Sequence, residues 1–188
     1  MTTTTALPLV IGRDLPPAEA ARLCADGLLV SVVGDVLVSA DTVLDAAGRA
    51  ACADAQLRCD RAEPGAWVLA HGSALWVHCG PVFRLVLERV VVLGPRGRTT
   101  RYLGAVDYRQ GRLEESEVEH IGGVPVTVPE RTAADALRLL APPAALIALA
   151  ELDAARELDR AGIEAALGRL RGARGIARAR RTLRTWSR

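Results

Sequence analysis

The change in hydrophobic pattern at Pro129 constrains the fold of this chain more than any other sequence feature. Before that proline, short runs of β-branched residues are separated by glycine and proline, a pattern typical of strands and tight turns. After it, apolar residues recur at helical spacing, as in Ala133, Ala136 and Leu137. Strands followed by helices, without regular alternation, predict an α+β fold rather than a parallel βαβ fold.

The N-terminal segment predicts a helix followed by a tight hairpin. Two prolines stand at the start of Pro17–Ala25, where a helix loses no donor that it needs. Gly34 and Asp35 then separate the apolar runs Leu28–Val33 and Val36–Ser39, which predicts a two-residue turn. A helix followed by a hairpin is the second half of a winged helix. We therefore expect a truncated winged-helix-like segment at residues 1–40.

Residues 41–188 are predicted to form an α+β domain, with a small mixed or antiparallel sheet, helices and a helical C-terminus. Asp41–Arg58 has helical spacing, and Asp41 is a candidate N-cap. The other predicted elements are strands at Ala66–Ala70, Val82–Leu87, Arg89–Leu93 and Tyr102–Arg109, a helix at Ser73–Val77, a basic turn at Gly94–Arg98, a hairpin of Val118–Ile121 and Val124–Val128, and helices at Ala144–Leu158, Ile163–Leu170 and Ala173–Trp186.

The composition excludes several classes of protein. Half of the residues are hydrophobic and 3% are aromatic, which excludes a disordered chain and predicts a core of mostly Val, Leu and Ala. All 24 basic residues are arginine. The absence of lysine excludes Schiff-base chemistry, a Ser–Lys dyad and a phosphate-loop lysine. Every basic side chain is instead a permanently charged planar group that suits carboxylates and phosphates.

The sequence predicts a cytoplasmic protein without a membrane segment. No apolar stretch approaches the roughly 20 residues of a membrane helix. The short apolar run Ala6–Ile11 has no charged region before it, as a signal peptide would have. The cysteines Cys24, Cys52, Cys59 and Cys79 form no Cys-x-x-Cys pair. Cys52 and Cys59 lie too far apart on one predicted helix to form a disulfide, and a reducing compartment fits this pattern.

Two segments carry a resemblance to a known family. Gly123–Asp135 reads Gly-Val-Pro-Val-Thr-Val-Pro-Glu-Arg-Thr-Ala-Ala-Asp. It resembles the pattern Gly-x-Pro-Val-Thr-(Ser/Thr)-x-x-Arg-Thr-x-x-Asp of the AbiEi-like antitoxins. These belong to type IV toxin–antitoxin systems of the abortive-infection class and are common in actinobacteria. Ala70–Trp76, followed by Gly80, is similar to the family's short His-x-(Ser/Thr)-Ala-Ala helix. Arg89–Leu93, the basic turn and Gly104–Tyr108 are similar to its central hairpin, so the resemblance spans roughly residues 20–185.

The resemblance implies an antitoxin that counteracts a cognate nucleotidyltransferase-type toxin, without requiring a stable complex, and that can also repress its own operon. It implies binding rather than catalysis. Many members begin with a complete winged helix-turn-helix that has a strongly basic recognition helix. Here only one helix and the wing are recognisable, and Arg22 is the candidate operator DNA contact, close to Glu19 and Asp26. Some relatives continue into a nuclease-like domain, which has no counterpart here.

The motif also has a physical explanation that needs no catalysis. Pro125 at a strand start fits an edge position, and Pro129 fits the first turn of a helix. Arg131 and Asp135 are four residues apart on one helix face and can pair. A catalytic role for the motif is the alternative. The residues that we expect to be structural are Pro125, Thr127, Arg131, Thr132, Asp135, His71 and Ser73.

Positive charge is concentrated at the C-terminus. The last 22 residues hold eight arginines and no acidic residue, whereas the 166 before them hold 16 arginines and 22 acidic residues. If this segment is helical, four arginines spaced three, four and three apart form one stripe. This stripe is the candidate site for nucleic acid or an acidic partner, and a solvent-exposed face of a packed helix is the alternative. Its members are Arg171, Arg174, Arg178 and Arg181.

Two other groups of side chains are candidates for chemistry. His71, His78 and Cys79 do not have the ligand number and spacing of a structural zinc site. Ser73 with His71 or His78 would make a hydrolase or a phosphotransfer enzyme, but the Gly-x-Ser-x-Gly frame is missing. We therefore expect no catalytic residue, no metal and no cofactor. A DNA-binding transcriptional regulator without a toxin is the second hypothesis.

An acidic cluster precedes the predicted hairpin. It is expected to be a solvated loop, and in an antitoxin it could engage a basic groove of the toxin. Its members are Glu114, Glu115, Glu117 and Glu119.

Overall fold

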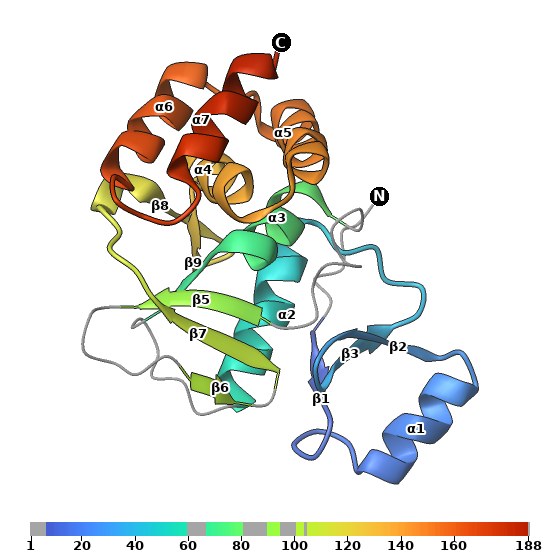
Figure 1. The fold of residues 1–188 in the computed structure, drawn as a ribbon. Coiled ribbons are helices and arrows are strands. Elements are labelled where there is room, and N and C mark those ends of the chain that lie inside the picture. The colour runs from blue at the N-terminus through green and yellow to red at the C-terminus, as the bar shows by residue number, and fades with distance from the viewer. Residues whose placement is uncertain (1–6, 60–66, 81–89, 95–100, 104, 188) are drawn as a thin grey trace.

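The computed structural model describes residues 7–59, 67–80, 90–94, 101–103 and 105–187. Within them, seven α-helices and two sheets form the mixed α+β fold predicted from the sequence (Figure 1). The strands are β1 (Leu9–Val10), β2 (Leu29–Val33), β3 (Val36–Ser39), β4 (Val68–Leu69), β5 (Val90–Gly94), β6 (Arg101–Leu103), β7 (Val106–Gln110), β8 (Val118–Ile121) and β9 (Val124–Thr127). The helices are α1 (Pro17–Ala25), α2 (Ala46–Cys59), α3 (His71–Cys79), α4 (Pro129–Leu139), α5 (Pro142–Arg156), α6 (Arg160–Arg169), α7 (Ile176–Thr185) and the short 3-10 helix η2 (Glu115–Glu117).

The N-terminal segment contains the predicted helix and hairpin. α1 has the expected bounds, and β2 and β3 pair antiparallel in a three-stranded sheet of order β1-β3-β2. α1 lies at the periphery of the molecule and buries only Ala20. The helix and the hairpin are confirmed as elements, whereas the likeness to a winged helix stays a prediction.

The hairpin turn packs against the rest of the chain. The backbone N–H of Asp35 donates to Oε1 of Gln56 on α2, at 2.8 Å. Gly34 has φ +53°, and a Cβ placed there would lie 2.6 Å from Cβ of Ala105. Val33 and Val36 belong to the same buried apolar cluster as side chains of α2 and the larger sheet. The turn is therefore held on the body of the protein.

The larger sheet has six strands in the order β6-β7-β5-β4-β9-β8. β5 pairs parallel with β7 and β4 with β9, and the other pairs are antiparallel, so the sheet is mixed as predicted. The prediction of one strand over Tyr102–Arg109 is wrong. Leu103 pairs with Val106, so the segment folds back as two strands, β6 and β7.

α2 begins later than predicted, and its cap differs. The helix starts at Ala46, and Oδ1 of Asp45 accepts the N–H of Gly48 at 2.7 Å. Asp41 instead accepts a hydrogen bond from the hydroxyl of Ser39. Aspartate is a common N-cap residue, and Asp45, which directly precedes the helix, caps the first turn. The predicted strand Val82–Leu87 and most of the basic turn at Gly94–Arg98 lie outside the described residues.

The C-terminal helices α4–α7 gather at one end of the molecule, at the top of Figure 1. α4 is central and packs against α3, α5, α6 and α7. α5 begins with a proline pair, Pro142 and Pro143, which preset the backbone of the first turn. The predicted helical C-terminus is confirmed. In the described part of the chain, no helix combines the length and apolar character required to cross a bilayer.

Candidate functional site

The motif residues form the junction between β9 and α4. The hydroxyl of Thr132 donates to the carbonyl oxygen of Thr127 at 3.0 Å, and the two threonine hydroxyl oxygens lie 2.8 Å apart. Because each hydroxyl carries one proton, the Thr127 hydroxyl is the donor in the second bond. Both side chains are fully buried. These bonds and Pro129 in the first turn hold the start of the helix in place.

The predicted edge position of Pro125 is wrong. β9 has β8 on one side and β4 on the other, and Pro125 pairs with His120 of β8. β4 is only two residues long and pairs with β9 through Leu69 and Val126. Pro125 is therefore next to the one residue of β9 that pairs with β4, so its missing N–H removes few hydrogen bonds from the sheet.

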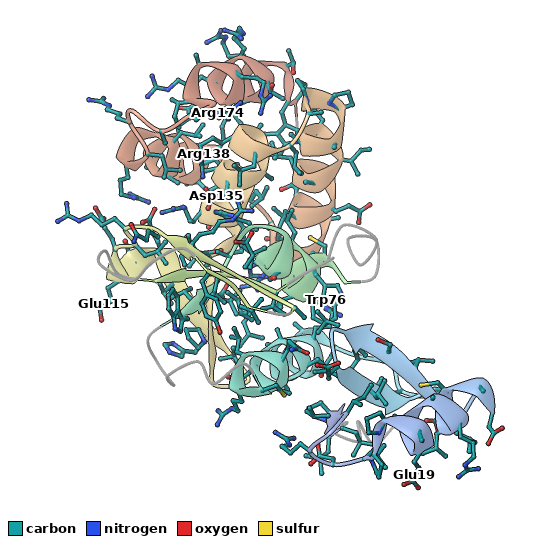
Figure 2. The ribbon with its side chains drawn as sticks, turned by 60° about the horizontal axis from the view of Figure 1, so that its bottom comes forward. Glu19, Trp76, Glu115, Asp135, Arg138 and Arg174 are labelled. Atoms are coloured by element: carbon teal, nitrogen blue, oxygen red, sulfur yellow. The ribbon has the colours of Figure 1, made fainter. Side chains whose placement is uncertain are left out.

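Arg131 and Asp135 pair as predicted, but the pair is buried. Nε of Arg131 donates to Oδ2 of Asp135 at 3.0 Å, with side-chain exposures of 3% and 0%. Oδ1 of Asp135 accepts from Nη2 of Arg138, and Nη1 of Arg131 donates to Oε2 of Glu117, each at 3.0 Å. Figure 2 shows Asp135 and Arg138 on α4, with Arg174 near them. Carboxylates and guanidinium groups therefore alternate through the interior.

The expectation that the acidic cluster is a solvated loop is wrong for Glu117. The 3-10 helix η2 turns this side chain inward until 1% of it is exposed. Its Oε1 accepts from Nε of Arg169 on α6 at 3.0 Å, and its Oε2 accepts from Arg131. Glu119 is partly buried and pairs with Arg156 at 2.9 Å. Only Glu114 and Glu115 have the exposure expected of a solvated loop.

His71 is the first residue of α3 and lies beside Asp135. Its φ of +52° is in the left-handed region, which a residue with a side chain adopts at a cost. Nε2 lies 3.6 Å from Oδ2 of Asp135, and Nδ1 lies 3.3 Å from Nη1 of Arg109. A guanidinium can only donate, so Nδ1 accepts and the ring proton is on Nε2, facing Asp135. Burial, opposed by the charge of Asp135, lowers the pKa of His71 to about 4.

This lowered pKa predicts stability that is lost in acid. The unfolded chain takes up a proton at His71 near pH 6.5, whereas the folded chain does so only near pH 4. The free energy of unfolding should therefore fall as the pH drops through that window, by roughly 3 kcal/mol in all from this residue. His78, whose pKa is also lowered by burial, acts in the same direction.

Urea unfolding at pH 7 and pH 4.5 measures this effect. The His71→Gln variant should lose less stability between the two pH values than the unchanged protein does. The same pH dependence in both proteins would show that His71 is not held neutral by the fold.

The network opens into a pocket of about 740 Å³ between the end of β7, the segment before η2, α4 and the connection from α6 to α7. Two glutamates, Glu114 and Glu117, also line it, and Leu93, Leu139 and Leu170 provide apolar wall. Six arginines also line the pocket. Only two of them, Arg131 and Arg171, were candidate site residues in the sequence, because the six come from separate segments of the chain. The lining arginines are Arg109, Arg112, Arg131, Arg138, Arg169 and Arg171.

The predicted stripe of tail arginines does not form. α7 begins at Ile176 and not at Ala173, so Arg171 and Arg174 precede the helix. Gly172 and Gly175 have φ of +83° and +91°, which ends helical geometry between them. Arg171 lines the pocket, and the carbonyl of Arg174 accepts from Arg138.

Two arginines of the predicted stripe, Arg178 and Arg181, lie on α7, and only Arg181 is exposed. Nη2 of Arg178 donates to the carbonyl oxygen of Arg138 at 2.8 Å and so satisfies an acceptor at the end of α4. Arg181 is exposed. Arg178 is therefore a packing residue, and Arg174 and Arg181 remain as outward-facing candidates for contact with a partner.

The other predicted site residues are tied to structural partners. Arg22 is exposed on α1 and pairs with Asp26 at 3.1 Å. Ser73 is buried, and its hydroxyl oxygen accepts the N–H of Val91 at 2.7 Å. Nε2 of His78 donates to the carbonyl of Thr127 at 2.9 Å, and Nδ1 lies 3.1 Å from a guanidinium nitrogen of Arg156. These contacts do not favour the hydrolase alternative.

Nothing in the described ranges groups three or more His, Cys, Asp or Glu side chains so that they could hold a metal ion. The pocket instead offers guanidinium donors, which bind oxyanions. A comparison with models of known protein families and with curated protein sequences finds no match. The pocket is rich in guanidinium donors and lies beside buried ion pairs.

Proposed function

We propose that the chain is an antitoxin-like protein that counteracts a cognate nucleotidyltransferase-type toxin in the cytoplasm by binding, without turnover. The burial of the motif supports this most. Thr127, Arg131, Thr132 and Asp135 are at most 3% exposed and bond to one another or to neighbouring elements. Residues buried in this way position a surface and do not present a nucleophile to a substrate.

The surface best suited to contact a partner lies at the basic C-terminal end. The side chains of Arg174 and Arg181 are exposed, and α7 carries no acidic residue. The N-terminal segment offers less to operator DNA. Arg22 is paired with Asp26, and the turn of the β2–β3 hairpin packs on Gln56. The proposal therefore gives this segment no role in DNA binding.

Co-expression tests the proposal. The proposal predicts that a nucleotidyltransferase-like protein is encoded beside this chain. That protein should arrest growth when expressed alone, and co-expression of this chain should restore growth. The Arg174→Ala/Arg181→Ala double variant should restore growth less well while keeping the thermal stability of the unchanged chain. Arg22→Ala, which removes an exposed arginine from α1, is the control and should restore growth fully.

Two outcomes would contradict the proposal. If the neighbouring protein stays toxic in the presence of the unchanged chain, neutralisation is not its function. If the double variant and the Arg22→Ala control neutralise equally well, the C-terminal arginines are not the contact surface. Co-purification is not a suitable readout, because the proposal does not require a stable complex.

A further inference from the structure

The pocket holds an excess of positive charge that its own acids do not balance. Six arginines line it against two glutamates, Glu114 and Glu117. Asp107 and Asp135 pair with arginines from behind the lining. The two arginines that lack an acidic partner among the described residues, Arg112 and Arg171, are exposed at the rim. Their charges give the mouth of the pocket a positive potential, which attracts anions.

Several guanidinium donors in the pocket are not used by the described part of the chain. Nε of Arg169 is bound to Glu117, and its two terminal nitrogens have no hydrogen-bond partner among the described residues. Nε of Arg138 is buried and, within the same residues, also lacks an acceptor. Arg112 and Arg171 are exposed at the rim and form no ion pair with the described acids. The buried Nε of Arg138 needs an acceptor, and the exposed guanidinium groups of the other three are free to bind an oxyanion.

The buried acids hold these donors in position. Glu117 fixes Arg169 through Nε, and Asp135 fixes Arg138 through Nη2. An arginine that is already immobilised loses little side-chain freedom when a ligand binds. The network below the pocket therefore preorganises its cationic floor, and the ligand meets a fixed arrangement of donors.

Size and charge limit the class of ligand. A volume of about 740 Å³ lies within the range typical of small-molecule sites. Planar guanidinium groups approaching from several sides suit an anion with many oxygen acceptors, and the phosphates of a polyphosphate are such acceptors. The leucine side chains at 93, 139 and 170 offer an apolar wall for the uncharged part of a ligand.

We propose that this pocket binds a small ligand with two or more adjacent phosphate groups, of which a nucleoside di- or triphosphate is the representative. Arg138 and Arg169 bind the inner phosphate from the floor, and Arg112 and Arg171 close over the outer phosphates at the rim. The inference does not depend on the antitoxin proposal, because it follows from the pocket alone.

Isothermal titration calorimetry on the full chain tests the inference. The titrants are ATP, GTP, inorganic tripolyphosphate and adenosine at one fixed salt concentration. The triphosphates should bind and adenosine should not. Arg112→Gln and Arg171→Gln remove exposed rim charges that form no ion pair with the described acids, and each should weaken binding about tenfold. Arg184→Gln, which removes an exposed arginine of α7 outside the pocket, is the control and should bind as the unchanged chain does.

The titrants also distinguish between sources of the phosphate. Tighter binding of ATP or GTP than of tripolyphosphate supports a nucleotide, and equal binding supports a site that recognises the phosphates alone. The inference is overturned if no phosphate compound binds. It is also overturned if the rim variants and Arg184→Gln bind alike, or if a single-stranded RNA oligonucleotide binds while the nucleotides do not. None of these results bears on growth rescue in co-expression, so the two proposals can fail separately.

Discussion

The Asp135→Asn variant should unfold with a free energy about 3 kcal/mol lower than that of the unchanged protein. Asp135 is fully buried, and its two carboxylate oxygens accept hydrogen bonds from Arg131 and Arg138. Asparagine has nearly the same shape but no charge, and its amide nitrogen would point donors at a guanidinium or at the Nε2 proton of His71. Urea unfolding at pH 7, followed by tryptophan fluorescence, measures the difference.

The Glu164→Gln variant is the control for this experiment. It removes the charge of a carboxylate that pairs with Arg160 four residues away, as Asp135 pairs with Arg131. Both partners on α6 are exposed, at 44% and 61%, so the loss should stay below about 1 kcal/mol. Equal losses in the two variants would show that Asp135 does not support a buried network in solution.

Replacing Gly175 with alanine should destabilise the chain by about 2–3 kcal/mol. Gly175 precedes α7 with a φ of +91°, which a residue with a side chain adopts only under strain. The added Cβ would also lie 2.5 Å from the carbonyl oxygen of Arg138, a backbone atom that cannot move aside cheaply. Either α7 or the end of α4 must shift.

Gly168→Ala is the matched control, and its expected effect has the opposite sign. Gly168 lies within α6 with nothing within 4 Å of an added Cβ. Alanine is the better helix former there, so the free energy of unfolding should rise by about 0.5–1 kcal/mol. Thermal and urea unfolding of both variants give the comparison. A Gly175→Ala variant as stable as Gly168→Ala would show that the approach of Gly175 to α4 does not constrain the fold.

Elements with strong local signals could be predicted from the sequence. α1, the β2–β3 hairpin and the β8–β9 hairpin have their predicted positions, because prolines, glycines and alternating apolar residues act within a few residues. Features decided by tertiary neighbours could not be predicted. Pro125 satisfied an edge pattern, but the order of strands in the sheet is set by segments far away in the chain.

The candidate site could be predicted only where its signals are local in the sequence. The spacing of Arg131 and Asp135 predicted their pairing, since four residues bring two side chains together on a helix. The burial of Glu117 had no local signal, because its partners Arg131 and Arg169 lie 14 and 52 residues away. A helix was predicted over Ala173–Trp186, but the positive φ values of Gly172 and Gly175 prevent a helix before Ile176.

The long reach of the Glu117–Arg169 contact has a consequence for how the chain matures on the ribosome. Synthesis proceeds from the N-terminus, so η2 and α4 are complete while Arg169 is still unmade or inside the exit tunnel. Until α6 emerges, Glu117 lacks one of the two arginines that compensate its buried charge, and α4 lacks two of the four helices that pack on it, α6 and α7. The interior of the C-terminal half therefore closes only after α6 and α7 have left the ribosome, and a product terminated before Arg169 would be left for proteases to remove.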